Sequence, residues 1–301
     1  MKYLVITMLL SQGATFAKNK VVYGQDNRMS VSDSSEFWQV RAKAVASMHK
    51  RSKLLVPKAS DKVFKQTSVF TLGEQYSLCE DERFVKEPVL SDCTGFLISE
   101  DTLVSAGHCF KAMPSPYYGN ADKVCEDYVW VFDYTQTKAV DYKVQFSKVY
   151  ECSEVLVANY SFSNDFAIIK LKSKVSGVKP LSMSKEISKD SELIVVGHPS
   201  GLPKKVAPGG KVIEYNPKAN KFYASLDSFQ GNSGSPVFNK LGDVVGILVS
   251  GKTDYIFDEE AQCQRVNRCD QAGKSCLYEY DFVKGEGVTN INPILDNFQA
   301  E

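Results

Sequence analysis

From about residue 66 onward, the chain consists of short β-prone runs separated by turns, and this pattern constrains its fold more than any other feature. Many short strands at regular spacing favour an antiparallel barrel or sandwich. The end of the chain, 289–298, is typical of a short closing helix. The expected strands are 94–98, 102–105, 128–132, 142–146, 166–171, 193–196, 211–215, 221–225, 237–238, 244–249 and 277–280.

The charge balance excludes two classes of partner. The 301 residues carry 36 Lys and Arg against 36 Asp and Glu, so the formal net charge is zero. Nucleic acids and membrane surfaces attract proteins with a strongly positive field, so we expect neither as a partner. No apolar run approaches the roughly 20 residues that a membrane-spanning helix needs. The length suits one large domain or two small ones.

The N-terminus has the pattern of a secretory signal peptide over 1–17. A positive start, a short apolar stretch over 3–10 and small residues before Lys18 match that pattern. The alternative is a buried first strand or helix. The eight cysteines form no CxxC pair, which argues against zinc clusters and thioredoxin-type sites and favours disulfides in an exported chain. We therefore expect a secreted or periplasmic protein.

Residues 18–65 differ in character from the rest and are predicted to form an N-terminal extension or pro-segment. Within them, 37–51 is Ala-rich with apolar residues at helical spacing, which indicates a short amphipathic helix. Two interpretations are open. The segment is either a solvated helix with a linker, or a removable pro-segment that a protease cuts at Lys50, Arg51 or Lys53.

Three short motifs carry residues with catalytic chemistry. His108 follows an expected strand. Ser233 stands among small residues and glycines, which lets consecutive backbone N–H groups point at one spot, as stabilisation of an oxyanion requires. Asp165 opens a strongly apolar strand, where a carboxylate needs a partner that a histidine N–H would supply.

Together, in the order His, Asp, Ser, these motifs resemble the chymotrypsin-like serine peptidases. In that family the histidine precedes a cysteine, the aspartate opens an apolar strand, and the nucleophile lies in Gly-Asn-Ser-Gly-Ser-Pro or a close variant, as here over 231–236. The resemblance covers 66–301, taken as the peptidase domain. It implies an all-β fold of two antiparallel six-stranded barrels with a short C-terminal helix. An α/β-hydrolase elbow would need glycine where Ser235 stands, and its usual order of catalytic residues is the reverse.

The resemblance also implies roles for single residues. Ser233 would attack the scissile carbonyl, and His108 would take the hydroxyl proton and return it to the leaving amine. Asp165 would fix the imidazole tautomer and stabilise the imidazolium. The backbone N–H groups of Gly231 and Ser233 would form the oxyanion hole. The sequence has no metal, nucleotide or haem motif, so we expect no cofactor and no catalytic metal.

The same resemblance pairs Cys93 with Cys109, on either side of the histidine motif. The other six cysteines can pair in fifteen ways. Nearness in the sequence favours at least one bond within the group 263–276. These six are Cys79, Cys125, Cys152, Cys263, Cys269 and Cys276.

Several stretches favour the bacterial glutamyl-endopeptidase-like branch of the family. The opening 21–28 resembles the start of mature enzymes there, and 196–203 and 231–239 also have that branch's form. His198 is then a turn residue before proline rather than a catalyst. Asn232 stands where animal trypsins carry an aspartate, so their activation salt bridge is absent.

The specificity pocket gives a sharper but contested prediction. Asp227, followed by Ser228, lies six residues before the nucleophile, where an aspartate binds substrate Arg or Lys in trypsin-like enzymes. Leu248 replaces the wall histidine of glutamate-specific members, and Gly251 ends that wall. An unpaired carboxylate without a cationic wall should attract basic side chains and repel acidic ones. The alternative has Asp227 bonded internally.

The sequence therefore predicts an exported, monomeric serine endopeptidase that acts on protein or peptide substrates, with cleavage after Arg or Lys. A preference for Glu or Asp is the alternative within the same mechanism. Two other functions are open: a catalytically silent homologue that binds proteins, and a serine esterase or acyltransferase that uses the same three residues.

Overall fold

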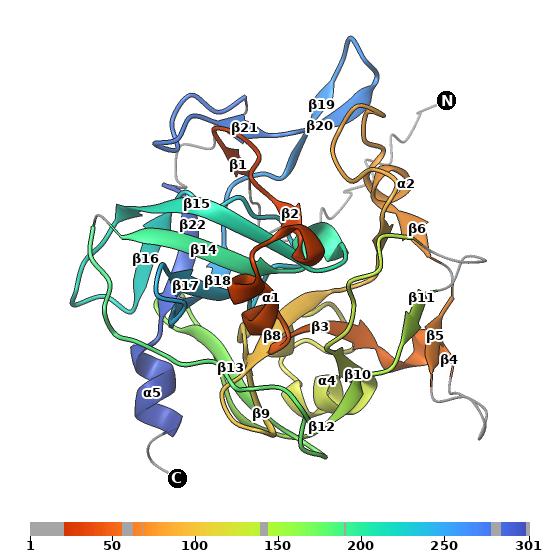
Figure 1. Cartoon of the computed structure of the whole chain (residues 1–301), viewed down its shortest axis with the longest axis vertical. Coiled ribbons are helices and arrows are strands. Elements are labelled where there is room, and N and C mark those ends of the chain that lie inside the picture. Colours follow the sequence, from red (N-terminus) through yellow and green to blue (C-terminus); the bar gives the residue numbers. More distant parts are fainter. Residues whose placement is uncertain are drawn as a thin grey trace, which may run out of the picture.

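The computed structural model describes residues 21–55, 63–67, 69–138, 144–189, 191–277 and 284–298. The predicted signal peptide over 1–17 and most of the expected strand 277–280 lie outside these residues. The described chain forms two β-barrels that lie side by side (Figure 1). No helix in this part of the chain combines the length and the apolar character needed to cross a membrane.

The first barrel is a closed ring of six antiparallel strands. Their spatial order is β10-β12-β13-β9-β8-β3, so β3 closes the ring by pairing with both β10 and β8. The strands are β3 (Val45–Lys50), β8 (Cys93–Leu97), β9 (Thr102–Ser105), β10 (Tyr128–Val131), β12 (Val149–Tyr160) and β13 (Asp165–Leu171).

The second barrel has the same strand number. Its sheet runs β14-β17-β18-β22-β16-β15, and an additional β14–β15 pairing closes it, while β2 extends it at β15. The strands are β2 (Met29–Ser30), β14 (Glu192–Gly197), β15 (Lys205–Glu214), β16 (Lys221–Ala224), β17 (Pro236–Asn239), β18 (Val244–Ser250) and β22 (Glu286–Asn290). The predicted all-β architecture of two six-stranded barrels is confirmed.

Shorter elements decorate the barrels. Of the helices, α5 closes the described chain as the sequence predicts. The helices are α1 (Glu36–Ala42), α2 (Leu72–Tyr76), α3 (His108–Lys111), α4 (Ala121–Asp127), α5 (Asn292–Phe298) and the 3-10 helices η1 (Val31–Asp33), η2 (Arg51–Lys53) and η3 (Pro199–Gly201). The remaining strands are β1 (Val22–Tyr23), β4 (Leu54–Leu55), β5 (Phe64–Gln66), β6 (Phe70–Thr71), β7 (Pro88–Val89), β11 (Val144–Phe146), β19 (Tyr255–Asp258), β20 (Cys263–Val266) and β21 (Arg268–Cys269).

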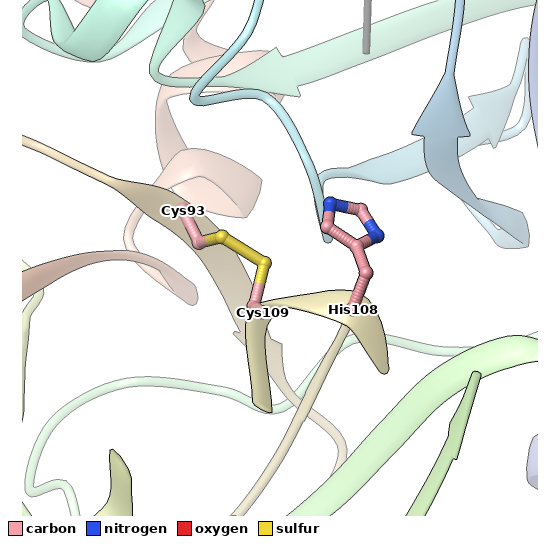
Figure 2. Close-up of side chains that lie close together, drawn as sticks. All are labelled: Cys93, His108 and Cys109. Atoms are coloured by element: carbon pink, nitrogen blue, oxygen red, sulfur yellow. A yellow bond between two sulfur atoms is a disulfide. The ribbon is translucent and has the colours of Figure 1, made fainter. Parts of the chain in front are cut away.

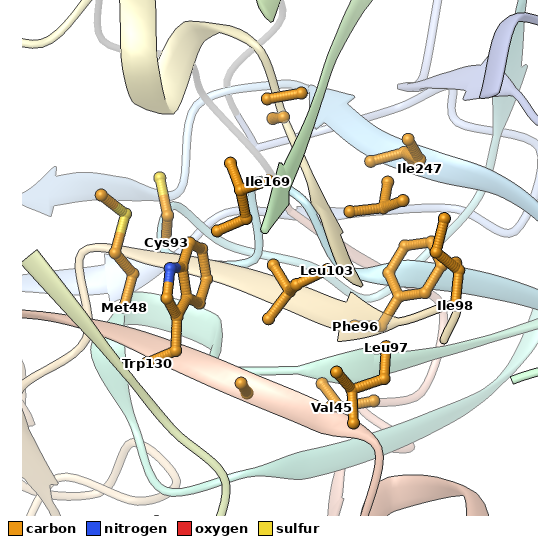
Figure 3. Close-up of a cluster of buried hydrophobic side chains, with 14 of the residues drawn as sticks. Val45, Met48, Cys93, Phe96, Leu97, Ile98, Leu103, Trp130, Ile169 and Ile247 are labelled. Atoms are coloured by element: carbon orange, nitrogen blue, oxygen red, sulfur yellow. The ribbon is translucent and has the colours of Figure 1, made fainter. Parts of the chain in front are cut away.

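One hydrophobic cluster joins the two barrels. Trp130, Phe96 and Leu103 fill the first barrel, and the cluster continues to Ile247 of the second (Figure 3). All four side chains are almost completely buried. Because the hydrophobic cores of the two barrels are continuous, the barrels pack together as one unit.

The structure corrects the prediction for 18–65. The predicted helix over 37–51 ends at Ala42, and Val45–Lys50 is strand β3 of the first barrel. The apolar residues of this stretch are buried on both sides of the strand, so the two-residue alternation that reveals a half-buried strand is missing. The segment 18–65 therefore contributes strand β3 to the first barrel, and cleavage at Lys50 or Arg51 would cut the chain directly after this strand. Removal of a pro-segment stays a prediction.

Four disulfides connect the described cysteines. Cys93 is bonded to Cys109, the pair that the resemblance implies. Cys269 and Cys276 form a bond within the C-terminal group, as nearness in the sequence favoured. The other two bonds are Cys79–Cys263 and Cys125–Cys152.

Candidate active site

His108 and Asp165 meet where two paired strands begin and end. β9 ends three residues before His108, β13 begins at Asp165, and the two strands pair side by side. The Asp165 carboxylate accepts two hydrogen bonds from the histidine, at 2.9 Å from its backbone N–H and at 2.9 Å from Nδ1. Asp165 is only 5% exposed. Because a carboxylate is the acceptor at Nδ1, the proton lies on Nδ1 and Nε2 is the basic nitrogen.

A short set of links brings Ser233 to this histidine. The backbone N–H of Thr94 donates to the carbonyl of Ser233 at 2.8 Å. Thr94 directly follows Cys93, and the disulfide joins Cys93 to Cys109, the residue after His108 (Figure 2). The loop that carries Ser233, residues 227–235, is therefore anchored to strand β8, which the disulfide joins to helix α3 of His108.

Two glycines allow the loop around Ser233 to approach the first barrel. Gly231 has φ +86° and Gly234 has φ +91°, a backbone region that side chains disfavour. A Cβ on Gly234 would lie 2.0 Å from the Thr94 carbonyl oxygen. The two glycines therefore allow the turn around Ser233, and Gly234 also allows the close contact with the Thr94 backbone.

The same loop leaves two N–H groups without an acceptor in the described part of the chain. The carbonyl of Gln230 accepts from a backbone N–H of η3, and that of Asn232 accepts from Ser235. In a trans peptide the N–H points opposite to the carbonyl. The N–H groups of Gly231 and Ser233 therefore point away from these bonds, and both remain available to a ligand.

Asp227 does not have the environment on which the Arg or Lys preference depends. One carboxylate oxygen accepts from the Tyr23 N–H at 2.8 Å, and the other accepts from the Asn27 N–H at 3.0 Å. Asp227 is 6% exposed. Burial raises its pKa to about 6, and the two backbone bonds only partly oppose this rise. The premise of an unpaired pocket carboxylate is wrong, and the internally bonded alternative is the one observed.

The other predicted pocket residues form a buried wall. Leu248 and Ser228 are fully buried, and Ser228 Oγ accepts from the Asn232 amide at 3.1 Å. Gly251 packs against a second buried carboxyl group, Glu286, whose Oε2 would lie 2.0 Å from a Cβ at that position. Glu286 could not be identified from the sequence, because its contacts with Tyr23 and Lys252 lie 263 and 34 residues away.

Tyr23 links both carboxyl groups. Its N–H bonds Asp227, and its phenol donates to Glu286 Oε1 at 3.2 Å. Val21, two residues earlier, accepts from the Ser228 N–H at 3.1 Å. The opening stretch, which the resemblance marked as the start of mature enzymes, thus packs against the beginning of the loop that carries Ser233.

Arg28 also contacts the loop that carries Ser233. Its guanidinium forms a buried ion pair with Asp26 at 2.7 Å and lies 4.1 Å from the ring centroid of Phe229. Phe229 belongs to the loop between Asp227 and Ser233. Contacts of the segment 21–28 with three successive loop residues therefore restrain the loop conformation.

The other two histidines are buried structural residues. His198 bonds the Leu202 carbonyl through Nδ1 at 2.9 Å and stacks on Tyr134, and burial lowers its pKa well below the usual value. His49 bonds Gln66 and Ser47, and burial lowers its pKa to about 4. Neither is near enough to solvent to exchange protons with a substrate.

One group of potential metal ligands occurs among the described residues: Cys93, His108 and Cys109. Both sulfur atoms belong to a single disulfide (Figure 2). A disulfide has no thiolate to offer a metal ion. The group is therefore a structural clamp beside the histidine and has the wrong chemistry for a metal centre.

Comparisons with known proteins agree with this architecture. A search of curated proteins found none that matches the chain. Among solved structures, a Glu endopeptidase in complex with MPD is 16% identical, with a TM-score of 0.51, and the match covers 93% of this chain and 98% of that one. The active form of the Rv3671c protease from M. tuberculosis is 13% identical, with a TM-score of 0.48, covering 94% and 91%. The likeness to the Glu endopeptidase concerns the fold alone.

The family comparison is more specific. The family model described as the trypsin-like peptidase domain matches residues 93–247, a span that begins at Cys93 and includes strands of both barrels. His108, Asp165 and Ser233 all lie inside this span. The chain therefore belongs to the trypsin-like peptidase family.

Proposed function

We propose that this protein is an exported serine endopeptidase whose catalytic residues are His108, Asp165 and Ser233. The observation that carries the proposal is the double hydrogen bond from the histidine to one buried carboxylate. A carboxylate in this position holds the imidazole in one orientation and in one tautomer. An imidazole ring fixed in this way can present its other nitrogen, Nε2, to the hydroxyl of Ser233.

The reaction follows from these positions. His108 Nε2 takes the proton from the Ser233 hydroxyl as the oxygen attacks the scissile carbonyl, and Asp165 stabilises the imidazolium that forms. The imidazolium then protonates the leaving amine, which breaks the peptide bond and leaves an ester on Ser233. Water hydrolyses that ester by the same proton transfers in reverse.

The oxyanion of each tetrahedral intermediate needs fixed donors. The N–H groups of Gly231 and Ser233 are the candidates, because both are free of acceptors in the described structure. Donors that are already oriented stabilise the developing charge without a reorganisation cost. The bonds at Gln230 and Asn232 keep them oriented.

Export is supported by the disulfides. Four disulfides in one chain persist in oxidising compartments and are rare in the cytosol. The signal-peptide pattern over 1–17 agrees with this location.

The test is mass spectrometry of an unstructured polypeptide after incubation with wild-type protein or with Ser233→Ala. New fragments made only by the wild type would support the proposal, and their C-terminal residues would give the preference at the cleaved bond. A wild-type protein that binds the polypeptide without cutting it would support the silent homologue instead. Equal cleavage by the two proteins would contradict the choice of Ser233 as the nucleophile.

A further inference from the structure

Lys221 extends across a neighbouring strand toward the pocket wall. It belongs to β16, and its ammonium donates to Ser250 Oγ in β18 at 3.0 Å, although β22 lies between these strands. The crossing is possible because β22 has a glycine at this point. A Cβ on Gly287 would lie 2.5 Å from Lys221 Cε and 2.3 Å from Ser250 Oγ.

The Lys221 ammonium has no carboxylate in ion-pair contact within the described residues, where the ion pairs all involve other cations. An ammonium has three donors, and Ser250 accepts one of them. Burial lowers the lysine's pKa, while the nearby charge of Asp165 acts in the opposite direction. A partly buried cation held by one neutral hydroxyl is a ready partner for an incoming anion.

An exposed aromatic ring lies beside this cation. Phe162 is 85% exposed, and its ring centroid lies 5.5 Å from Lys221 Nζ. The turn that carries it is fixed, because the Ser161 N–H bonds the Asn164 carbonyl at 2.8 Å and the Asn164 side chain accepts from Asn220 at 2.9 Å. The ring of Phe162 therefore offers a fixed apolar surface beside the ammonium, which the stem of a bound side chain can cover.

We propose that Lys221, Ser250 and Phe162 form a subsite for an acidic side chain of the substrate, on the acyl side of the scissile bond. The inference rests on the proposed peptidase function. Ser250 lies between Leu248 and Gly251, the wall of the pocket that holds the residue at the cleaved bond. Substrate residues that precede that bond therefore pass Ser250, where a carboxylate can meet the ammonium while its stem covers the ring of Phe162.

The test uses pairs of peptides that differ only by Glu or Gln at one position, about two to four residues before a bond that the enzyme cuts. We expect wild-type enzyme to cleave the Glu peptide with a kcat/KM higher by about fivefold or more at one of these positions, since a charge-assisted hydrogen bond replaces a neutral one. The advantage should shrink in high salt. Lys221→Met, which keeps the length of the side chain, should bring the Glu-to-Gln ratio close to one.

Lys218→Met is the matched control, because Lys218 is exposed in the connection between β15 and β16 and should leave the ratio as in wild type. The same peptide pairs are also titrated onto Ser233→Ala, which separates recognition from turnover. Preferential binding of the Glu peptide that Lys221→Met removes would support the subsite even if no peptide were cut, whereas cleavage with equal ratios at every position would overturn it. Absence of cleavage with discrimination in binding would count against the proposed function alone.

Discussion

Tyr23 and Asp227 are 204 residues apart in the chain and are joined by a 2.8 Å hydrogen bond from the tyrosine N–H to the carboxylate. The bond connects the first described residues to the beginning of the loop that carries Ser233. It also occupies the carboxylate that a trypsin-like pocket would use for substrate. The opening segment therefore determines the environment of Asp227, a residue that was expected to contact the substrate.

The first prediction concerns the acid stability that this carboxyl group controls. Burial raises the pKa of Asp227 from its ordinary 3.8 to about 6. Between these values the native state binds more protons than the unfolded state, so this group lowers the free energy of unfolding by about 2 kcal/mol as pH rises from 4 to 6. Asp227→Asn cannot ionise and should lack this fall.

The measurement is urea unfolding of wild type and Asp227→Asn at a series of pH values. The difference between their unfolding free energies should change most steeply across pH 4 to 6 and become constant above about pH 8. Asp296→Asn, an exposed acid in α5, is the control and should run parallel to wild type. Parallel curves for all three proteins would show that Asp227 ionises normally.

The second prediction concerns the orientation of His108. Asp165→Asn keeps the size of the side chain but can present its amide N–H to Nδ1, which favours the wrong tautomer. We expect kcat to fall by about 10⁴-fold with little loss of stability. Peptide hydrolysis by this variant is compared with Asp122→Asn, an exposed acid in the first turn of α4. A loss of less than tenfold would remove Asp165 from the mechanism.

These residues also show how far the sequence leads. His108, Asp165 and Ser233 could be proposed as catalytic residues from the sequence, because each lies in a short motif with recognisable neighbours. The partners of Asp227 could not be identified, because Tyr23 and Asn27 lie 204 and 200 residues away and bond through their backbone N–H groups, which every residue except proline has. A long-range hydrogen bond from a main-chain N–H group therefore cannot be recognised from the sequence.

Strand β3 was missed for a different physical reason. Both of its faces are buried, so apolar residues occur on both sides and the two-residue period disappears. What remains is an Ala-rich stretch with apolar residues at helical spacing. Position in the closed ring between β8 and β10, and not local propensity, makes Val45–Lys50 a strand.

The third prediction tests the close approach of the loop that carries Ser233 to the backbone of Thr94. Gly234→Ala adds a Cβ 2.0 Å from a carbonyl oxygen at a residue with φ +91°. Gly177→Ala meets the same backbone penalty at φ +70° but has no atom within 4 Å. We expect about 1 kcal/mol of destabilisation for Gly177→Ala and about 3 kcal/mol or more for Gly234→Ala, with loss of activity. Equal costs in thermal unfolding would mean that the loop adjusts freely.

The fourth prediction separates the stabilising and positioning effects of the Cys93–Cys109 bond. It closes a loop with a sequence separation of 16, and Cys125–Cys152 closes one of 27. Replacing either pair by alanine should cost about 3 kcal/mol in unfolding free energy, because the two loops constrain the unfolded chain similarly. Only loss of Cys93–Cys109 should also lower kcat, measured at a temperature where both variants are folded. Similar kcat values for the two variants would show that the bond does not position His108.

The last prediction concerns a buried lysine at the junction of the barrels. Lys204 is 2% exposed, and its ammonium donates to the carbonyls of Ala42 at 2.8 Å and Phe132 at 3.0 Å. Burial lowers its pKa from 10.5 to about 7. Between pH 7 and 10.5 the unfolded state binds more protons, so this group raises the free energy of unfolding as pH increases, by about 2 kcal/mol from pH 7 to 9. Lys204→Met should lack this rise, while Lys179→Met, at an exposed lysine, should retain it. Unfolding in urea at both pH values decides the matter: an equal rise in all three proteins would show that the ammonium stays charged between the barrels.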